Sequence, residues 1–376
     1  MKMAAGGMEM DWEREFKGYE TELEPNKREC AYSWMTAIGL QDVDGLKTSD
    51  FLRQTAKRNI EGEITQVEAV KLVEDYYDTK EGMSLPADMH EADVVSARLG
   101  VLISEPTFSL SPEFLYVIHR RLFGGLFPHA GIGRILNIAK KEWVLNGDTV
   151  YYADAEAVPA LLKQRFDEEA SFNYVGIGED AFLRHLSEFV AGIWQVHPFM
   201  EGNTRTIAVF TIKYLRSKRY DVTNDLFAKN AWYFRNALVR ANYENPSRKI
   251  SADTQYLQDF FTCLVFGAEI ELKNRYLRIG FEYGSQAAKC LEDAERTVKT
   301  RDRVMALIRN DPRVSISAMS RLLKISRSTV QKHVDALKTA VGLVHQGPRK
   351  GGHWTWAEAE FPLCESVKFK NVHECN

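Results

Sequence analysis

Between residues 182 and 215, two stretches with helical apolar periodicity are separated by a short polar loop. The first stretch, Phe182–Val196, spaces its apolar residues three and four positions apart, which predicts an amphipathic helix. Pro198 disfavours helical geometry at His197, so we expect this helix to end there. A second helical pattern begins at residue 203 or 204, with Asn203 as the expected N-cap. The loop from His197 therefore leads into the N-terminus of a helix.

The rest of the chain favours the same class of structure. Apolar residues recur at helical spacing, and only 11 of the 376 residues are proline. With 45% hydrophobic and 27% charged residues, the composition excludes a disordered or fibrous protein. One segment differs, because two β-prone runs, Trp143–Leu145 and Thr149–Tyr152, flank the hairpin turn signal Asn146-Gly147. We expect a mainly α-helical body that carries one β-hairpin.

Several classes of protein are disfavoured by what the sequence lacks. The five cysteines are scattered and form no CxxC pair, which argues against a zinc module and a dense disulfide framework. No apolar run reaches membrane-spanning length, and residues 1–10 lack the apolar core of a signal peptide. We therefore expect a cytoplasmic protein in a reducing compartment, without a membrane partner.

The loop and the helix start carry the residue types of a phosphate site. Free backbone N–H groups and the positive dipole end of a helix attract anions, and Gly202 permits a close approach. Arg205 would supply a planar cation to phosphate oxygens. Glu201 offers one carboxylate to a magnesium ion whose other ligands are phosphates. His197 is suited to accept the proton of an attacking hydroxyl.

Taken singly, these residues have simpler explanations. A histidine before a proline is more often a helix-terminal hydrogen-bonding residue, and Glu201-Gly202-Asn203 is an ordinary turn. Their combination is more specific. The segment His197-Pro198-Phe199-x-Glu201-Gly202-Asn203-x-Arg205 resembles the signature of the Fic (Fic/Doc) family, whose members mostly transfer the AMP of ATP to a hydroxyl side chain.

The resemblance implies a role for each matching position. His197 resembles the base that deprotonates the target hydroxyl, Phe199 the core residue that anchors the loop, and Glu201 the magnesium ligand. The phosphates of ATP would be bound at the helix start by Gly202, Asn203, Thr204 and Arg205. Thr204 departs from the usual glycine, and it would either add a hydroxyl contact to phosphate or cap the helix.

Two other segments match the family in the expected order. Gly131–Arg134, followed by Asn137-Ile138, resembles the Gly-x-x-Arg step before the family's flap, a hairpin that positions a target segment by strand pairing. The resemblance then gives this positioning role to four residues: Glu142, Trp143, Val144 and Leu145. The segment Leu226–Tyr243 resembles the part beside the nucleoside, where Tyr233 is a candidate wall of the base pocket. Core packing is the favoured explanation for Trp232 and Phe234.

A second departure concerns the nucleotide and its regulation. Ala208 stands where the family has a second arginine, which helps hold the terminal phosphate and pairs with an inhibitory glutamate. ATP remains the expected substrate, and other nucleotides or phosphate donors stay open. Glu61, before Gly62, is similar to that glutamate, although Lys57 replaces the usual Ser or Thr, and an ordinary surface glutamate is the simpler alternative. The segment Trp34–Gly39 has the shape of the inhibitory helix but no glutamate in place.

The C-terminal part has a different composition. Residues 301–356 contain eleven Lys and Arg against three Asp, a net charge of +8 in a chain whose total is −3. Helical patterns at Val304–Arg309, Ile316–Leu323 and from Ser326 precede a Gly-rich turn and Trp354–Trp356. This order resembles winged helix-turn-helix domains. The candidate DNA-binding residues are Arg327, Ser328, Thr329, Gln331 and Lys332, although such modules also dock proteins or dimerise.

The sequence thus predicts a mainly α protein, a Fic helical bundle with a hairpin flap and a C-terminal winged helix-turn-helix. The expected parts are an N-terminal helical segment (1–90), the Fic domain (91–280), a connector (281–299), the winged helix (300–358) and a tail (359–376). The expected function is transfer of AMP from ATP, with Mg²⁺, to a Ser, Thr or Tyr hydroxyl of a protein target, itself included. The alternative is a DNA-binding regulator whose Fic domain senses nucleotides, and a homo-oligomer stays open.

Overall fold

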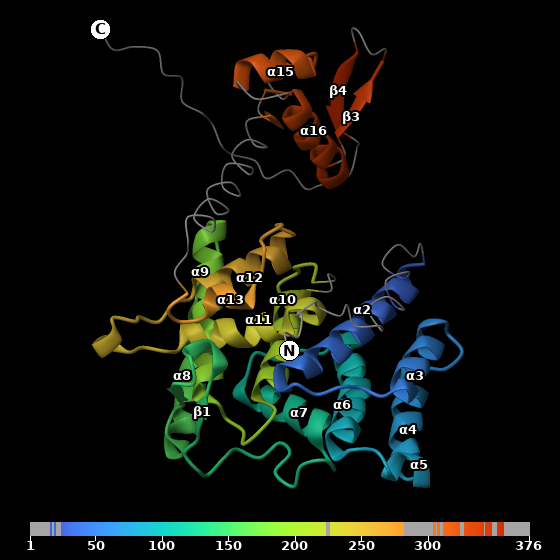
Figure 1. Ribbon diagram of the computed structural model, residues 1–376, viewed down its shortest axis with the longest axis vertical. Helices are drawn as coiled ribbons and strands as arrows, with labels where there is room; N and C mark the ends of the chain where they lie inside the picture. The colour runs from blue at the N-terminus through green and yellow to red at the C-terminus, as the bar shows by residue number, and fades with distance from the viewer. Residues whose placement is uncertain are drawn as a thin grey trace, which may run out of the picture. The chain divides into compact units, whose positions relative to one another are not determined.

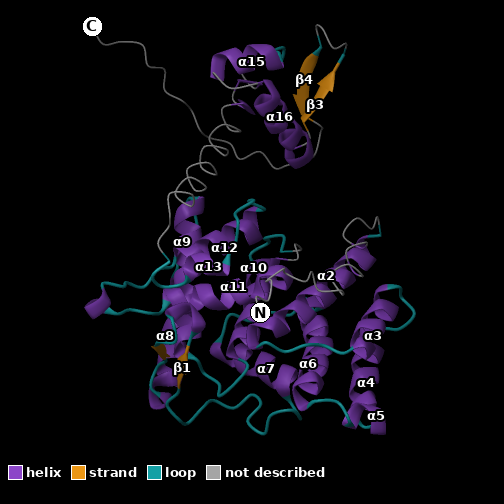
Figure 2. Ribbon diagram, viewed as in Figure 1, coloured by secondary structure: helices purple, strands orange, loops and turns teal. Residues whose placement is uncertain are grey.

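The computed structural model describes residues 16, 19, 24–222, 226–281, 304–305, 307–308, 311–323, 327–341, 343–347 and 352–356. The chain divides into two compact units, Met1–Phe281 and Glu282–Asn376 (Figure 1). Both are mainly helical, and each contains a small two-stranded sheet (Figure 2). Among the described residues, no helix has the length and apolarity needed to cross a membrane. The expected connector beyond residue 281 and the expected tail from residue 359 lie outside the described residues.

The first unit begins with helices whose starts follow local capping rules. They are α2 (Pro25–Gly39), the 3-10 helix η2 (Leu40–Asp44), α3 (Asp50–Ile60), α4 (Gln66–Tyr77), α5 (Lys80–Met83) and α6 (Ala87–Ser104). Ser49 accepts a hydrogen bond from the backbone N–H of Leu52 at the start of α3. Thr65 and Glu68 form a reciprocal capping box at the start of α4. The apolar spacing of the sequence predicts helices at Ser49–Arg58 and Thr65–Tyr77, and α3 and α4 confirm both.

These N-terminal helices are part of the same compact unit as the residues that follow them. Helix α2 packs against α6 and against α11 (Leu226–Ala241). The boundary expected near residue 90 falls inside α6. The close contact of α2 and α11 depends on Gly39, because a Cβ atom at this position would collide with the backbone of Ala228.

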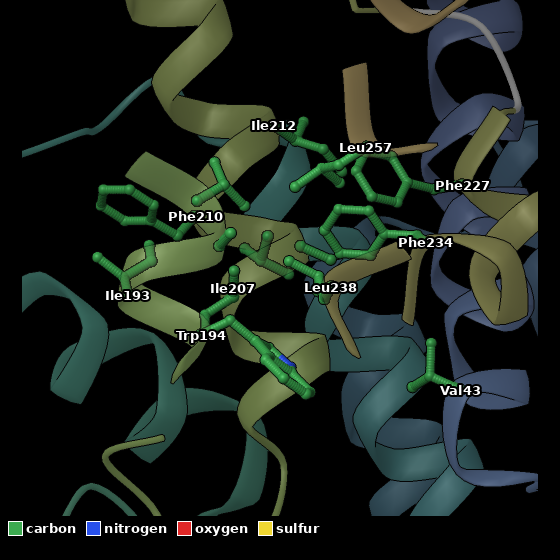
Figure 3. Close-up of a cluster of buried hydrophobic side chains, with 14 of the residues drawn as sticks. Val43, Ile193, Trp194, Ile207, Phe210, Ile212, Phe227, Phe234, Leu238 and Leu257 are labelled. Carbon is green, nitrogen blue, oxygen red and sulfur yellow. The ribbon is translucent and has the colours of Figure 1, made fainter. Parts of the chain in front are cut away.

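Helix α10 (Asn203–Ser217) is the central element of this unit. Every residue from Asn203 to Leu215 is buried. Helices η2, α6, α7 (Pro112–Phe123) and α9 (Glu179–Val196) pack against it, and Phe166 of α8 (Val158–Ser171) contacts its Phe210. Helix α12 (Gln255–Phe266) packs on α9 and α11, with the short α13 (Asn274–Leu277) against α11. Large side chains such as Trp194, Phe210 and Phe234 fill the space between them (Figure 3). Since α10 is surrounded on all sides, its N-terminus has a fixed position in the unit.

The predicted β-hairpin is present, but its first strand lies earlier in the chain. Strands β1 (Ala139–Lys141) and β2 (Thr149–Tyr151) pair antiparallel, with Ala139 opposite Tyr151. The segment Trp143–Leu145, predicted as a strand, is the 3-10 helix η3, so that prediction was wrong. The side chains of Val144 and Leu145 are both fully buried. Successive residues of a strand point to opposite faces, and a helical turn allows both neighbours to enter the core.

The second unit has the architecture of a winged helix. Its elements are α15 (Ile316–Leu323), α16 (Arg327–Val341), β3 (Leu343–Gln346) and β4 (His353–Trp356), with helical residues also around Val304 and Ile308. The two strands pair antiparallel with Leu343 opposite Trp356. Trp354 is buried against this core, and its indole N–H donates to the carbonyl of Val314 at 2.9 Å. The expected cap Ser326 lies outside the described residues.

The packing of α2 on α11 gives a stability test. Gly39→Ala places a methyl group against the backbone of Ala228, so we expect a loss of about 2 kcal/mol in the free energy of unfolding. Gly178→Ala is the matched control, because a Cβ atom there meets no atom within 4 Å. This control should cost less than about 1 kcal/mol, as an N-cap change. Chemical denaturation of both variants measures the difference, and equal stability would contradict the close approach of the two helices.

Candidate active site

The loop between α9 and α10 begins and ends with unusual backbone conformations. His197 follows the last residue of α9 and has φ of 50°, a left-handed conformation that is uncommon for a residue with a side chain. Gly202 has φ of 75° and is the N-cap of α10. A Cβ atom at Gly202 would collide with the ring of Phe123, so only glycine fits this position. The turn therefore places His197 and the start of α10 at two ends of one tight loop.

Asn203 fixes this loop from within. Its side-chain oxygen accepts from the backbone N–H of Phe199 at 3.0 Å, and its amide nitrogen donates to the carbonyl of Phe199 at 2.7 Å. Asn203 is thus the first residue of α10 and not its N-cap, which corrects the sequence-based expectation. The hydroxyl of Thr204 accepts from the indole N–H of Trp194 at 3.1 Å. The side chains of Asn203 and Thr204 thus hold the loop. The backbone N–H groups at the start of α10 are the groups that can bind an anion.

His119 holds the other side of the loop. Its ring stacks on Phe199, with centroids 3.8 Å apart. The backbone N–H of Gly131 donates to Nδ1 at 2.8 Å, so Nε2 carries the proton and donates to the carbonyl of Glu201 at 3.0 Å. Burial lowers the pKa of His119 to about 4, so the ring stays neutral in this role. No motif or spacing in the sequence indicated this residue.

Arg134 explains why the Gly-x-x-Arg segment matters for the site. Its buried guanidinium donates to the carbonyls of His197 at 2.7 Å, of Val196 at 3.2 Å and of Ala153. Its backbone N–H donates to the carbonyl of Pro198 at 2.9 Å. The carbonyls of Val196 and His197 lie at the C-terminal end of α9, where a cation is favourable. Arg134 therefore joins the end of α9, the loop and Ala153, the second residue after β2.

The ring of His197 is buried, stacked on one face and bound at Nδ1. Its Nδ1 lies 3.2 Å from the carbonyl of Trp194, which assigns the proton to Nδ1 and leaves Nε2 as an acceptor. The ring of Tyr152 stacks on it, with centroids 3.6 Å apart and an interplanar angle of 20°. Burial lowers the pKa of His197 well below its ordinary value, and the charge of Lys140 lowers it further. The imidazole is thus neutral near pH 7 and able to accept a proton.

Glu201 presents a half-exposed carboxylate beside the start of α10. The ammonium of Lys140, on strand β1, lies 3.3 Å from its Oε2 atom. In the described part of the chain, no group of three or more His, Cys, Asp or Glu residues is placed to hold a metal ion. One half-exposed carboxylate next to an anion site suits Mg²⁺, which often binds through one or two carboxylates and the phosphates of its substrate. Glu201 therefore fits the magnesium ligand expected from the sequence.

Arg205 is buried and paired with carboxylates from the N-terminal helices. Its Nε lies 2.9 Å from Oδ2 of Asp44, and its Nη2 lies 2.6 Å from Oε1 of Glu91. Its Nη1 donates to the side-chain oxygen of Gln41 at 3.0 Å. The structure places Glu61 elsewhere, at the end of α3, where it binds Lys27 and Tyr19.

Asp44 continues this set of charges toward the hairpin. Its Oδ1 lies 3.4 Å from Nη1 of Arg235, whose Nη2 lies 2.9 Å from Oε1 of Glu142. We call Glu91, Arg205, Asp44, Arg235 and Glu142 the charge chain. Its members come from four helices and the hairpin, and two of them, Asp44 and Arg235, are 191 residues apart in the sequence. No spacing in the sequence indicated Asp44, Glu91 or Arg235, because each approaches Arg205 or its neighbour only through the fold.

The structure also shows where the remaining candidate residues lie. In the hairpin, Glu142 is buried on Arg235, Val144 and Leu145 are in the core, and Trp143 is exposed. The backbone from Trp143 to Leu145 is a helical turn, so the free strand edge expected for target pairing does not lie at these three residues. Tyr233 is buried, with its ring parallel to Phe260, while Phe234 is in the core as favoured. Trp232 is partly exposed under the guanidinium of Arg235.

The candidate DNA-binding residues lie on the first turns of α16. Arg327 and Lys332 are exposed, and Thr329 and Gln331 are partly buried. The side-chain amide of Gln331 donates to Asp335 at 2.9 Å. Ser328 occupies the second position of the same helix.

Comparisons with known proteins agree with this geometry. The sequence pattern of the Fic/DOC family matches residues 109–215, which include α7, the hairpin, the loop and α10 up to Leu215. The pattern of winged helix-turn-helix DNA-binding domains matches residues 299–340. The first match ends within the central helix, and the second covers α15 and most of α16.

Two curated relatives match over short segments. The protein adenylyltransferase VbhT of Bartonella schoenbuchensis is 27% identical over 108 residues, which are 29% of this chain and 21% of that protein. A probable protein adenylyltransferase of Sinorhizobium fredii is 32% identical over 108 residues, 28% of this chain and 52% of the relative. The chain therefore matches about a fifth of the first relative and about half of the second.

Two solved structures are also similar. A Fic family protein from Desulfovibrio desulfuricans is 16% identical, with a TM-score of 0.39 over 93% of this chain and 95% of that chain. The N-terminal Fic domain of a Bartonella effector protein is 18% identical, with a TM-score of 0.38 over 48% of this chain and 84% of that chain. The two sequence patterns and the loop geometry together show that the chain contains a Fic/DOC family domain and, toward its C-terminal end, a winged helix-turn-helix domain.

Proposed function

We propose that this protein is a Fic-type protein adenylyltransferase, which transfers AMP from ATP to a Ser, Thr or Tyr hydroxyl of a protein target. The observation that carries the proposal is the loop His197–Gly202, which brings a neutral imidazole, a half-exposed carboxylate and a helix N-terminus together. A base, a metal ligand and an anion site are what such a transfer needs. The names of the two curated relatives support the same reaction.

The residues of the loop have distinct tasks in this reaction. The target hydroxyl attacks the α-phosphorus of ATP, a new O–P bond forms, and the bond to the bridging oxygen of pyrophosphate breaks. His197 accepts the hydroxyl proton at Nε2, because its Nδ1 is committed to the carbonyl of Trp194. The backbone N–H groups at the start of α10 stabilise the growing negative charge of the leaving pyrophosphate. Magnesium, bound by Glu201 and the phosphates, would supply further positive charge to these oxygens.

The positive charge available to the phosphates is smaller than the sequence alone indicates. Ala208 provides no cation, and Arg205 is already paired with Asp44 and Glu91. The two carboxylates therefore restrain phosphate binding, either by competing for the guanidinium or by repelling the anion. We assign the restraining role to these residues in place of Glu61, which lies outside the charge chain.

The transfer itself is tested by incubating purified protein with Mg²⁺ and α-labelled ATP, beside a His197→Ala variant. We expect label on the protein or on a lysate target with the wild type, and a loss of about a hundredfold or more in the variant. The variant should still bind ATP, since His197 acts on the hydroxyl. Parallel reactions with γ-labelled ATP and with other nucleotides test the alternative donors. Equal labelling of the variant would contradict the role of His197, and ATP binding without any transfer would favour a nucleotide sensor.

The restraint by the charge chain is tested with Asp44→Asn and Glu61→Gln. Asp44→Asn removes a negative charge beside Arg205, so we expect the affinity for MgATP to rise about threefold. The same variant should lose about 2 kcal/mol in the free energy of unfolding, because Arg205 and Arg235 share this carboxylate. Glu61→Gln is the control and should leave the affinity unchanged. Calorimetric titration measures the affinity of both variants for MgATP. If the affinity rises in Glu61→Gln alone, the restraint belongs to Glu61 and not to the charge chain.

A second function, DNA binding, is proposed for the winged helix. It is favoured by the net charge of +8 between residues 301 and 356 and by the exposed Arg327 and Lys332 on α16. In winged and related helix-turn-helix folds, the corresponding helix enters the major groove. The two functions would be combined in a regulator that binds DNA through α16 and nucleotides through the loop His197–Gly202.

Variants of α16 test DNA binding in the full chain. We expect Arg327→Ala and Lys332→Ala each to weaken duplex binding and to reduce the salt dependence of the binding constant by about one ion. Lys338→Ala is the control on the same helix, because Lys338 is already paired with Asp335 at 2.8 Å. Binding measured over a salt series decides the outcome. Affinity that is equal for every sequence and disappears at physiological salt would count against a regulatory role.

A further inference from the structure

Tyr152, directly after strand β2, lies against the proposed base. Its ring stacks on His197, with centroids 3.6 Å apart and an interplanar angle of 20°, and meets the indole of Trp194 edge to face at 5.4 Å. The side chain is 8% exposed. The carbonyl of the next residue, Ala153, accepts from Arg134, which also holds the carbonyl of His197. Tyr152 and His197 are therefore fixed relative to each other by the same cation.

The hydroxyl of Tyr152 has no hydrogen-bond partner among the described residues, although it is buried. Buried hydroxyls are nearly always paired, because an unpaired one loses its hydrogen bonds to water and gains nothing. Phenylalanine would stack on His197 equally well without this cost. The packing of the ring therefore does not explain why the residue is a tyrosine.

The surroundings of this hydroxyl are those of the proposed phosphate site. The charges that act on it are the carboxylates of Glu142 and Glu201 and the guanidinium of Arg235. Burial and the two carboxylates raise the pKa of Tyr152, so the hydroxyl keeps its proton and is a donor. A donor whose ring stacks on the proposed base, and which has no hydrogen-bond acceptor among the described residues, is suited to an acceptor on the substrate.

We propose that the hydroxyl of Tyr152 donates a hydrogen bond to a phosphoryl oxygen of the nucleotide bound at the start of α10. This inference rests on the proposed function, because the loop must bind a nucleotide. Phosphoryl oxygens are strong, anionic acceptors, and a neutral donor adds a contact without adding charge to the site. The contact makes up in part for the arginine that Ala208 replaces. In the same position, the ring keeps the imidazole of His197 oriented.

Tyr152→Phe separates the hydroxyl from the ring, and Tyr151→Phe is the matched control on the exposed side of the hairpin. We expect Tyr152→Phe to be as stable as the wild type, or more stable, in thermal unfolding without nucleotide, because it removes an unpaired buried hydroxyl. Its affinity for a Mg²⁺ complex of α,β-methylene ATP should fall about tenfold. Tyr151→Phe should change neither quantity. Isothermal titration calorimetry and thermal unfolding measure them on the full chain.

The outcomes distinguish this contact from the reaction. If Tyr152→Phe binds the analogue as tightly as the wild type, or loses stability together with affinity, the hydroxyl contact is wrong whatever the transfer assay shows. If the wild type transfers no label, yet only Tyr152→Phe loses affinity for the analogue, the contact holds and the proposed transfer fails. Absence of any binding to the wild type overturns both.

Discussion

Helix α10 is buried from Asn203 to Leu215, and this burial fixes the position of the candidate active site. A helix surrounded on all sides cannot shift, so the backbone N–H groups at its start point to one defined place. The loop before it is held there by Asn203, His119 and Arg134, through bonds to its backbone. The hydrogen bonds of these three polar side chains thus position the loop.

The charge chain is the second constraint, and it makes the N-terminal helices part of the site. Asp44 and Glu91 come from η2 and α6, and they pair with Arg205 at the first turn of α10. A buried guanidinium needs such partners, since an unpaired buried charge is costly. The same pairing lowers the positive charge that a phosphate would meet. The ion pairs of Arg205 therefore favour folding but weaken the attraction that its charge would have for a phosphate.

Local features of the fold could be predicted because they depend on near neighbours in the sequence. Helices α3 and α4 lie where the apolar spacing predicts them, and α9 ends at the residue before His197. The hairpin was found through Asn146-Gly147, but its first strand was misplaced. Trp143 and Val144 favour strands by propensity, whereas in the structure Val144 and its neighbour Leu145 are both buried in the core.

The sequence by itself determined the helical class, the loop with His197 and Glu201, and the basic winged helix, because each of these depends on residues that are consecutive in the chain. The tertiary structure alone decided what surrounds the loop. Tyr152 precedes His197 by 45 residues, and Asp44 precedes it by 153. Glu91 and Lys140 lie between these two in the sequence. Contacts over such separations leave no periodic or spaced pattern in one sequence, since only the packing of α10 among its neighbours brings them to the site.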